Sequence, residues 1–180
     1  IGFARRVVAY KRTNFIFSDF ERLKKIAGQN GGLQMIFSGK AWQYDDSGKE
    51  IIRNLFAYKR QAGEHLQIVY LPNYDMQIAS KMVAGCDLWL NNPIIPLEAS
   101  GTSGMKANLN GVPNFSVLDG WWPEGWVEGV TGWSIGTQSG DETNKIQEIE
   151  DVYDKLENRI LPVYKDRSAW VKIMKKCISI

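Results

Sequence analysis

The sequence predicts an α/β protein built on a parallel β-sheet with helices on both faces. Short apolar runs alternate with longer amphipathic segments through the first two thirds of the chain, in five successive strand-then-helix units. Apolar residues make up 44% of the sequence and charged residues 23%, a balance typical of a globular domain and not of a disordered chain. We expect one such domain to occupy residues 1–180.

The first half of the chain supplies three of these units. Residues 3–10, "FARRVVAY", predict a strand, although two arginines interrupt it. Residues 17–28 place apolar side chains at helical spacing and end on Gly28, a residue common just after a helix. The same patterns predict strands over 33–39 and 66–72, and helices over 49–63 and 76–85.

The second half is less regular. Residues 86–92, "CDLWLNN", and 114–119, "NFSVLD", predict strands, with a glycine-rich loop and a helix starting near Gly104 between them. Residues 120–136 are rich in tryptophan and glycine, and we expect an ordered loop with a short hairpin. The remaining patterns predict helices over 144–158 and 168–180.

Polar loops follow four of the predicted strands, with the sequences "AYKR", "SGKA", "LPNYD" and "LEASGTSGMK". In an open parallel sheet, ligands bind outside the carboxyl ends of the strands. The topology therefore predicts that these loops meet at one edge of the sheet and form the functional site.

Charge and cysteine content narrow the classes of function. The formal charge of +2 is too small to indicate a nucleic-acid partner, no apolar run is long enough to span a bilayer, and the first ten residues lack the features of a signal peptide. Cys86 and Cys177 lie far apart, which favours buried thiols in a reducing cytoplasm. With His65 the single histidine, we expect no histidine-based metal site and no Ser-His-Asp triad.

The glycine-rich loop suits a phosphate, because several unobstructed backbone N–H groups precede the start of a helix. Lys106 follows within a few residues, where its amine could bind the aldehyde of a phosphate-bearing cofactor. The plain alternative is a solvated lysine, and the loop does not have the Walker pattern.

A second group of candidates lies near the first strand. Arg5, Arg6 and Lys11 could clamp a phosphate, or they could belong to a frayed terminal strand. Glu98 could hold sugar hydroxyls or be an exposed loop residue. Tyr74 and Asp75 could be ligand-binding residues or ordinary turn residues. The tryptophans of the glycine-rich segment could pack in the core or a hairpin, or they could stack on sugars; they are Trp121, Trp122, Trp126 and Trp133.

The segments "RRVVAYKR", "FSGKA", "LPNYDMQIASKMVAGCDLWLNNP", "LEASGTSGMKA" and "NGVPNFSVLDGWWPEG" closely resemble α-glucan (glycogen/starch) phosphorylases, above all their short bacterial and archaeal forms. The resemblance runs in order through residues 3–136. It implies the second, Rossmann-like lobe of a GT-B glycosyltransferase. Such an enzyme uses pyridoxal 5′-phosphate to transfer terminal α-1,4-linked glucose from a glucan to inorganic phosphate, giving glucose 1-phosphate with retained configuration.

The resemblance also implies roles for single residues. Lys106 would be the Schiff-base lysine, Arg5 would face the cofactor phosphate, and Tyr74 would lie near the pyridine ring. The backbone of Gly101, Thr102 and Ser103 would line the cofactor phosphate. The substrate phosphate would be held by Arg6 and Lys11, and the glucose hydroxyls by Glu98, Ser100 and Gly101.

Three positions depart from the long-form pattern "EASGTGNMK … NYR". Ser103 and Gly104 replace glycine and asparagine, as in short forms, and Asp75 stands where long forms have arginine. Because a carboxylate beside the cofactor phosphate would repel it, the contact of Asp75 must differ. The resemblance further implies that a first, N-terminal lobe is absent from this chain, and that the lobe alone has little phosphorolytic activity.

Two alternatives to a phosphorylase lobe stay open on sequence grounds. A nucleotide-sugar-dependent GT-B glucan synthase could share an E-x-x-G loop, but it would need no lysine at position 106. A non-catalytic carbohydrate-binding domain would bind glucan through its tryptophans without Lys106, Arg6 or Lys11.

Overall fold

The computed structural model describes residues 1–137 and 142–180, with side chains described for 1–137 and 146–180. Within this part of the chain, six parallel strands form one sheet in the order β3-β2-β1-β4-β5-β6. Their bounds are β1 (Gly2–Ala4), β2 (Leu33–Ser38), β3 (Leu66–Leu71), β4 (Trp89–Asn91), β5 (Asn114–Val117) and β6 (Gly132–Ile135). The predicted Rossmann-like α/β fold is confirmed, and the strand order reverses between β1 and β4, where such sheets bind ligands.

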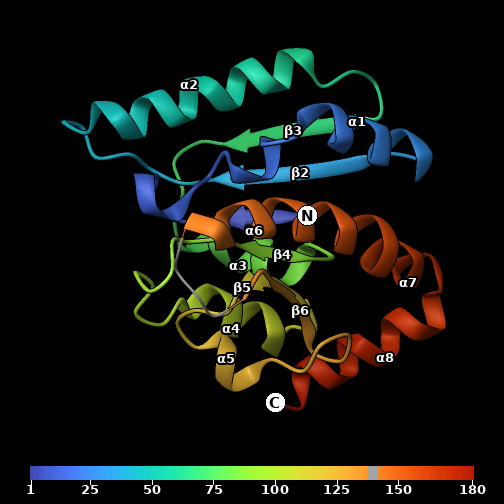
Figure 1. The fold of residues 1–180 in the computed structure, drawn as a ribbon. Coiled ribbons are helices and arrows are strands. Elements are labelled where there is room, and N and C mark those ends of the chain that lie inside the picture. Colours follow the sequence, from blue (N-terminus) through green and yellow to red (C-terminus); the bar gives the residue numbers. More distant parts are fainter. Residues whose placement is uncertain (138–141) are drawn as a thin grey trace.

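Helices connect the strands and cover both faces (Figure 1). Most begin or end close to the predicted positions. Their bounds are η1 (Ala9–Lys11), η2 (Phe15–Phe17), α1 (Phe20–Gln29), α2 (Asp46–Gln61), α3 (Met76–Gly85), α4 (Thr102–Leu109), α5 (Trp122–Gly125), α6 (Glu142–Lys155), the π-helical η3 (Leu156–Ile160), α7 (Leu161–Lys165) and α8 (Arg167–Ile178).

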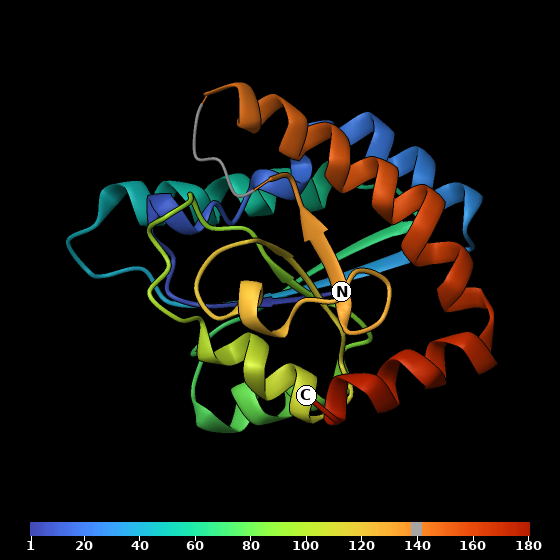
Figure 2. The ribbon, with the colours of Figure 1, turned by 60° about the horizontal axis from the view of Figure 1, so that its bottom comes forward.

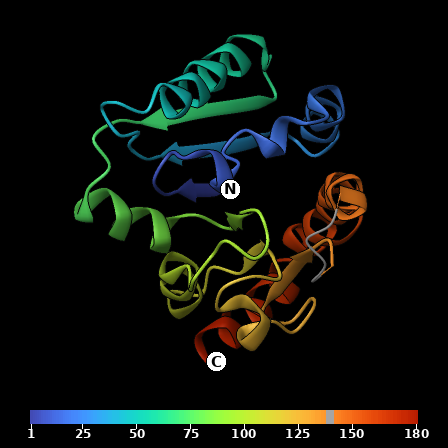
Figure 3. The same ribbon diagram turned by 60° about the vertical axis from the view of Figure 1, so that its left-hand side comes forward.

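The sheet separates two apolar cores, and Figure 3 shows α3 and α4 on one side of it and α1 and α6 on the other. The larger core packs η2, α1, α6, η3 and α8 against the sheet and includes Phe17, Leu23 and Tyr153. The smaller core packs α3 and α4 against the sheet through residues such as Met82 and Ala107. Burial on both faces explains why the strands are apolar runs without strict alternation.

The chain after β6 crosses back over the sheet and ends beside α4, as Figure 2 shows. Trp170 of α8 stacks on Trp133 of β6, with ring centroids 5.9 Å apart and planes inclined by 15°. This contact fixes α8 along the β6 side of the sheet. Within the described residues, no helix has both the length and the apolar content required to cross a membrane.

Two local predictions were wrong. The first strand ends at Ala4 instead of continuing to residue 10, because Arg5 turns its side chain into a buried ion pair and the chain then forms η1. The hairpin expected within 120–136 is instead β6, which pairs in parallel with β5. The helix expected near Gly104 begins close to that position, at Thr102, and Gly104 lies in its first turn.

Candidate active site at the carboxyl edge of the sheet

The loops that follow β1, β2 and β4 are joined by backbone hydrogen bonds, so they form one continuous edge. The N–H of Val7 donates to the carbonyl of Lys40 at 3.0 Å, and the N–H of Ile94 donates to the carbonyl of Tyr10 at 2.8 Å. These bonds bring the segment containing Arg5 and Lys11 against both neighbouring loops. The predicted convergence of polar loops is therefore confirmed for these three.

A buried ion-pair cluster formed by Arg5, Lys11 and Glu98 lies at this edge. Glu98 Oε2 accepts a hydrogen bond from Lys11 Nζ and lies 3.3 Å from Arg5 Nη1. All three side chains are 7–8% exposed. The structure thus brings together two predicted phosphate ligands and the predicted sugar ligand, and it excludes the frayed-strand interpretation because β1 lies in the middle of the sheet.

Arg5 keeps hydrogen-bonding capacity that its ion pair with Glu98 does not satisfy. Its Nη1 lies near Glu98 but finds no hydrogen-bond acceptor of suitable geometry among the described residues. Burial lowers the pKa of Arg5, and the Glu98 carboxylate opposes this shift. Burial raises the pKa of the half-buried Tyr74, and the positive charge of nearby Arg5 offsets part of that rise. A buried guanidinium with a free donor is suited to an anionic ligand.

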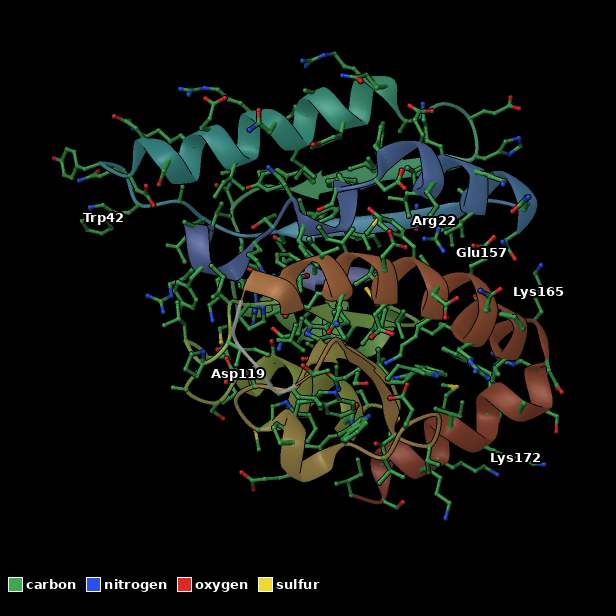
Figure 4. All side chains as sticks on the ribbon, in the orientation of Figure 1. Arg22, Trp42, Asp119, Glu157, Lys165 and Lys172 are labelled. Atoms are coloured by element: carbon green, nitrogen blue, oxygen red, sulfur yellow. The ribbon has the colours of Figure 1, made fainter. Side chains whose placement is uncertain are left out.

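Glu98 lies in the loop before α4, and hydrogen bonds to the loop after β5 hold its backbone in place. The N–H of Glu98 donates to Asp119 Oδ2 at 2.9 Å, and the other oxygen of Asp119 accepts from the N–H of Gly120. The N–H of Trp121 donates to the carbonyl of Ser100 at 2.9 Å. Asp119, labelled in Figure 4, thereby ties the loop after β5 to the loop that contains Glu98 and Ser100.

The first turn of α4 has no side-chain cap, because its N-cap is Gly101 in the left-handed region at φ 76°. Glycine adopts this conformation without strain. The N–H groups of Thr102 and Ser103 open this turn, where the helix dipole favours an anion. A Cβ at Gly104 would lie 2.5 Å from Asn114 Oδ1, so only glycine lets this turn approach β5 so closely.

Lys106 and Arg6 lie outside the ion-pair cluster. Lys106 is exposed and lies in the last turn of α4, not two residues from its start, whereas Gly104, Ala107 and Asn108 form the buried face of the same helix. Arg6 is exposed, whereas its neighbour Arg5 is buried. The side chains of Lys106 and Arg6 are both accessible to a ligand.

Two ambiguities of the sequence are settled by contacts. Asp75 is the N-cap of α3, and its Oδ1 accepts from the N–H of Ile78 at 2.8 Å, so its carboxylate is engaged by a helix start. Trp122 and Trp133 are 0% and 2% exposed and belong to the interior. Trp121 is half-buried and packs edge-on against Trp122, and the half-buried Trp126 donates to Glu128.

Sequence reasoning did not assign a role to Arg12. Its Nε and Nη2 donate to the carbonyls of Asn92 and Pro93, its Nη1 pairs with Glu148 of α6, and the amide of Asn92 donates back to the carbonyl of Arg12. Arg12 therefore fixes the loop of Lys11 against the loop that leads to Glu98. In the sequence, the position of Arg12 next to Lys11 pointed to a role at the site. Its pairing with Glu148 could not be predicted, because the two residues are 136 positions apart.

Trp42 and Tyr44 were also missed. They lie in the loop between β2 and α2, are 67% and 79% exposed, and form an edge-to-face pair with centroids 6.3 Å apart. Figure 4 shows Trp42 projecting away from the body of the molecule, at the edge toward which the arrowheads of β2 and β3 point in Figure 1. An exposed tryptophan at the end of a polar loop was a readable signal for ligand contact.

A parallel sheet with helices on both faces, and with cations and a glycine loop at its carboxyl edge, defines the chain as a Rossmann-like α/β domain. No cluster of three or more metal-ligating side chains occurs in the part of the chain that the structure describes. A sequence model of the carbohydrate phosphorylases matches residues 4–124. The chain belongs to the carbohydrate phosphorylase family, whose members are GT-B glycosyltransferases.

Similar curated proteins agree with this assignment. The chain is 48% identical to maltodextrin phosphorylase of Thermococcus litoralis and 43% identical to glycogen phosphorylase of Aquifex aeolicus, in both cases over 99% of its length. It is 39% identical to glycogen phosphorylase of Mycobacterium tuberculosis over 97% of its length. The matches cover 22%, 27% and 21% of these relatives, so the chain spans about a quarter of their length.

Proposed function

We propose that residues 1–180 are the second, C-terminal lobe of an α-glucan phosphorylase, acting together with a first lobe that this chain lacks. The proposed reaction transfers terminal α-1,4-linked glucose from a glycogen-, starch- or maltodextrin-type glucan to inorganic phosphate, giving glucose 1-phosphate with retention. The buried cluster of Arg5, Lys11 and Glu98 is the observation that supports it best. It places phosphate-binding cations in contact with a carboxylate suited to sugar hydroxyls.

Pyridoxal 5′-phosphate is the cofactor of this proposal, and the residues present fit it. Arg5 offers a buried donor that, among the described residues, has an ion-pair partner but no well-aligned hydrogen-bond acceptor, and the first turn of α4 has no side-chain cap. The residues that would hold the cofactor are Lys106 for its aldehyde, Tyr74 beside its ring, and Arg5, Gly101, Thr102 and Ser103 for its phosphate. When bound, the cofactor supplies a phosphate group that exchanges a proton with the substrate phosphate.

The chain's own side chains would bind and orient the substrates. Arg6 and Lys11 would hold inorganic phosphate, and Glu98, Ser100 and Gly101 would hold the glucose hydroxyls. Fixed cations near two phosphates stabilise the negative charge that develops as the glycosidic bond breaks. Low exposure at Lys11 and Glu98 keeps water away and strengthens these interactions.

The family assignment favours a phosphorylase over the nucleotide-sugar-dependent synthase. The burial of Trp122 and Trp133 weakens the case for a non-catalytic glucan-binding domain built on those rings. Cys86 and Cys177 are free and buried thiols, which fits the cytoplasmic location that we propose with the reaction.

Covalent labelling tests the cofactor site. The chain is incubated with pyridoxal 5′-phosphate, reduced with borohydride and mapped by peptide analysis. We expect one major adduct on Lys106, absent in Lys106→Ala and retained in Lys81→Ala, which removes an exposed lysine from the neighbouring α3. Labelling spread over many lysines, unchanged by Lys106→Ala, would contradict the proposal.

Activity tests the two-lobe assignment. We expect the 180-residue chain alone to release little or no glucose 1-phosphate from glucan and phosphate. Ordinary rates of release by this chain would show that no first lobe is required.

A further inference from the structure

Glu98 binds two cations through a single oxygen: Lys11, which the proposed function assigns to inorganic phosphate, and Arg5, which it assigns to the cofactor phosphate. Lys11 Nζ and Arg5 Nη1 both contact Oε2. The second oxygen, Oε1, lies on the side of Gly101, 3.7 Å from the position that a Cβ of that glycine would occupy. One oxygen of the carboxylate therefore contacts Lys11 and Arg5, and the other lies beside the start of α4.

This arrangement makes phosphate and Glu98 competitors for the same cations. The three side chains are almost fully buried, so their charges are poorly screened by water. Inorganic phosphate that contacts Lys11 while Glu98 keeps its position would place two anions side by side, which is unfavourable. Phosphate binding therefore requires the carboxylate to turn toward other hydrogen-bond donors.

Sugar hydroxyls are donors of the required kind, and the side of Oε1 is where they can bind. The loop around Glu98 is held at its backbone by Asp119 and at Ser100 by Trp121, so the side chain can rotate without moving the loop. Hydroxyl donors on the carboxylate weaken its hold on Lys11 and Arg5. The cations then become available to phosphate.

We propose that Glu98 couples the two halves of the site: a bound glucose unit draws the carboxylate away from Lys11 and Arg5, and inorganic phosphate then binds Lys11 more tightly. This inference rests on the proposed function, which assigns sugar and phosphate to these residues. Coupling between binding sites is reciprocal, so phosphate must raise the affinity for glucose by the same factor.

Calorimetric titration of the chain with inorganic phosphate, in the absence and presence of saturating D-glucose, tests the coupling. For the wild-type chain we expect glucose to tighten phosphate binding at least threefold, with the reciprocal effect in glucose titrations. Glu98→Gln should bind phosphate more tightly than wild type without glucose, and glucose should no longer change that affinity. Glu124→Gln, which removes one exposed negative charge from α5, should behave as wild type.

The outcomes separate this inference from the proposed function. If phosphate binds, requires Lys11 as judged by Lys11→Ala, and ignores glucose in the wild-type chain, the coupling is wrong and the phosphate site stands. Weaker phosphate binding by a folded Glu98→Gln would also overturn the coupling. If phosphate does not bind, or binds equally well to Lys11→Ala, the proposed phosphate site at Lys11 and the proposed coupling are both wrong. The wild-type titrations decide the question even if Glu98→Gln does not fold.

Discussion

Arg12 and Glu148 form an ion pair between the loop after β1 and helix α6, across 136 residues of sequence. The side chains are 13% and 4% exposed, and the Arg12 guanidinium also lies 4.3 Å from the centre of the Phe15 ring. The pair connects α6 to the segment that positions Lys11. The outer helix layer thus supports the candidate site.

Replacing Glu148 with glutamine should therefore destabilise the fold. Removal of one partner leaves a buried, under-compensated guanidinium, and we expect the free energy of unfolding to fall by about 3 kcal/mol in urea denaturation. Glu150→Gln is the matched control on the same helix, because Glu150 is 73% exposed and pairs with Arg22. That change should cost at most about 1 kcal/mol. Equal effects of the two substitutions would argue against a structural role for the buried pair.

Gly104 should tolerate no larger residue. In Gly104→Ala the new methyl group would meet Asn114 Oδ1 at 2.5 Å and Trp121 Nε1 at 2.9 Å. We expect a loss of about 1–3 kcal/mol in unfolding free energy and weaker labelling of Lys106 by the cofactor. Gly85→Ala in the last turn of α3 meets nothing within 4 Å and should be neutral or stabilising by up to about 1 kcal/mol. A Gly104→Ala variant as stable as Gly85→Ala would refute the close approach of α4 and β5.

Tyr153 should stabilise the fold through its hydroxyl. The hydroxyl donates to the carbonyl of Ile16 at 2.9 Å and accepts from the N–H of Asp19 at 2.6 Å. In Tyr153→Phe both backbone groups lose this partner, and we expect a loss of about 1–3 kcal/mol in chemical denaturation at neutral pH.

The same residue predicts an alkaline dependence. Burial is the main cause that raises the pKa of Tyr153 from 10.0 to about 12. Its contribution to stability is complete below the pKa of the unfolded chain and declines as pH rises from about 10 to about 12, because the unfolded state ionises first. The stability difference between wild type and Tyr153→Phe should therefore narrow over this range. A difference that grows with pH would show that the phenol is not held neutral.

Trp42 should contribute to glucan binding but not to folding. Its side chain is 67% exposed, so Trp42→Ala should leave the thermal midpoint unchanged. We expect it to weaken binding of a maltodextrin such as maltoheptaose by about 0.5–1.5 kcal/mol, the scale of a ring contact, and Trp42→Phe to restore most of the loss. Unchanged affinity in Trp42→Ala would place the glucan path elsewhere on this edge.

Local sequence signals accounted for the helices and the glycine loop. Among the helices whose first turns the structure describes, four begin at aspartate N-caps, Asp19, Asp45, Asp75 and Asp166, each accepting from N–H groups two or three residues further on. Such caps and the apolar spacing depend only on near neighbours, which is why α1, α2 and α3 were predicted closely. Lys106, Gly101 and Glu98 could be proposed as site residues because they lie within one short, unusual loop.

The sequence alone determined the α/β class, the family resemblance and the residue types of the candidate site, since these depend on patterns within single segments. Tertiary structure decided that "GWSI" is the sixth strand and not part of a hairpin, because strand identity there depends on pairing with β5. It also decided that Lys11 and Arg5 share Glu98 and that Arg12 meets Glu148. Lys11 and Glu98 are 87 residues apart in the sequence, and Arg12 and Glu148 are 136 residues apart. Only folding brings such charges into a common, water-poor environment, where they must pair.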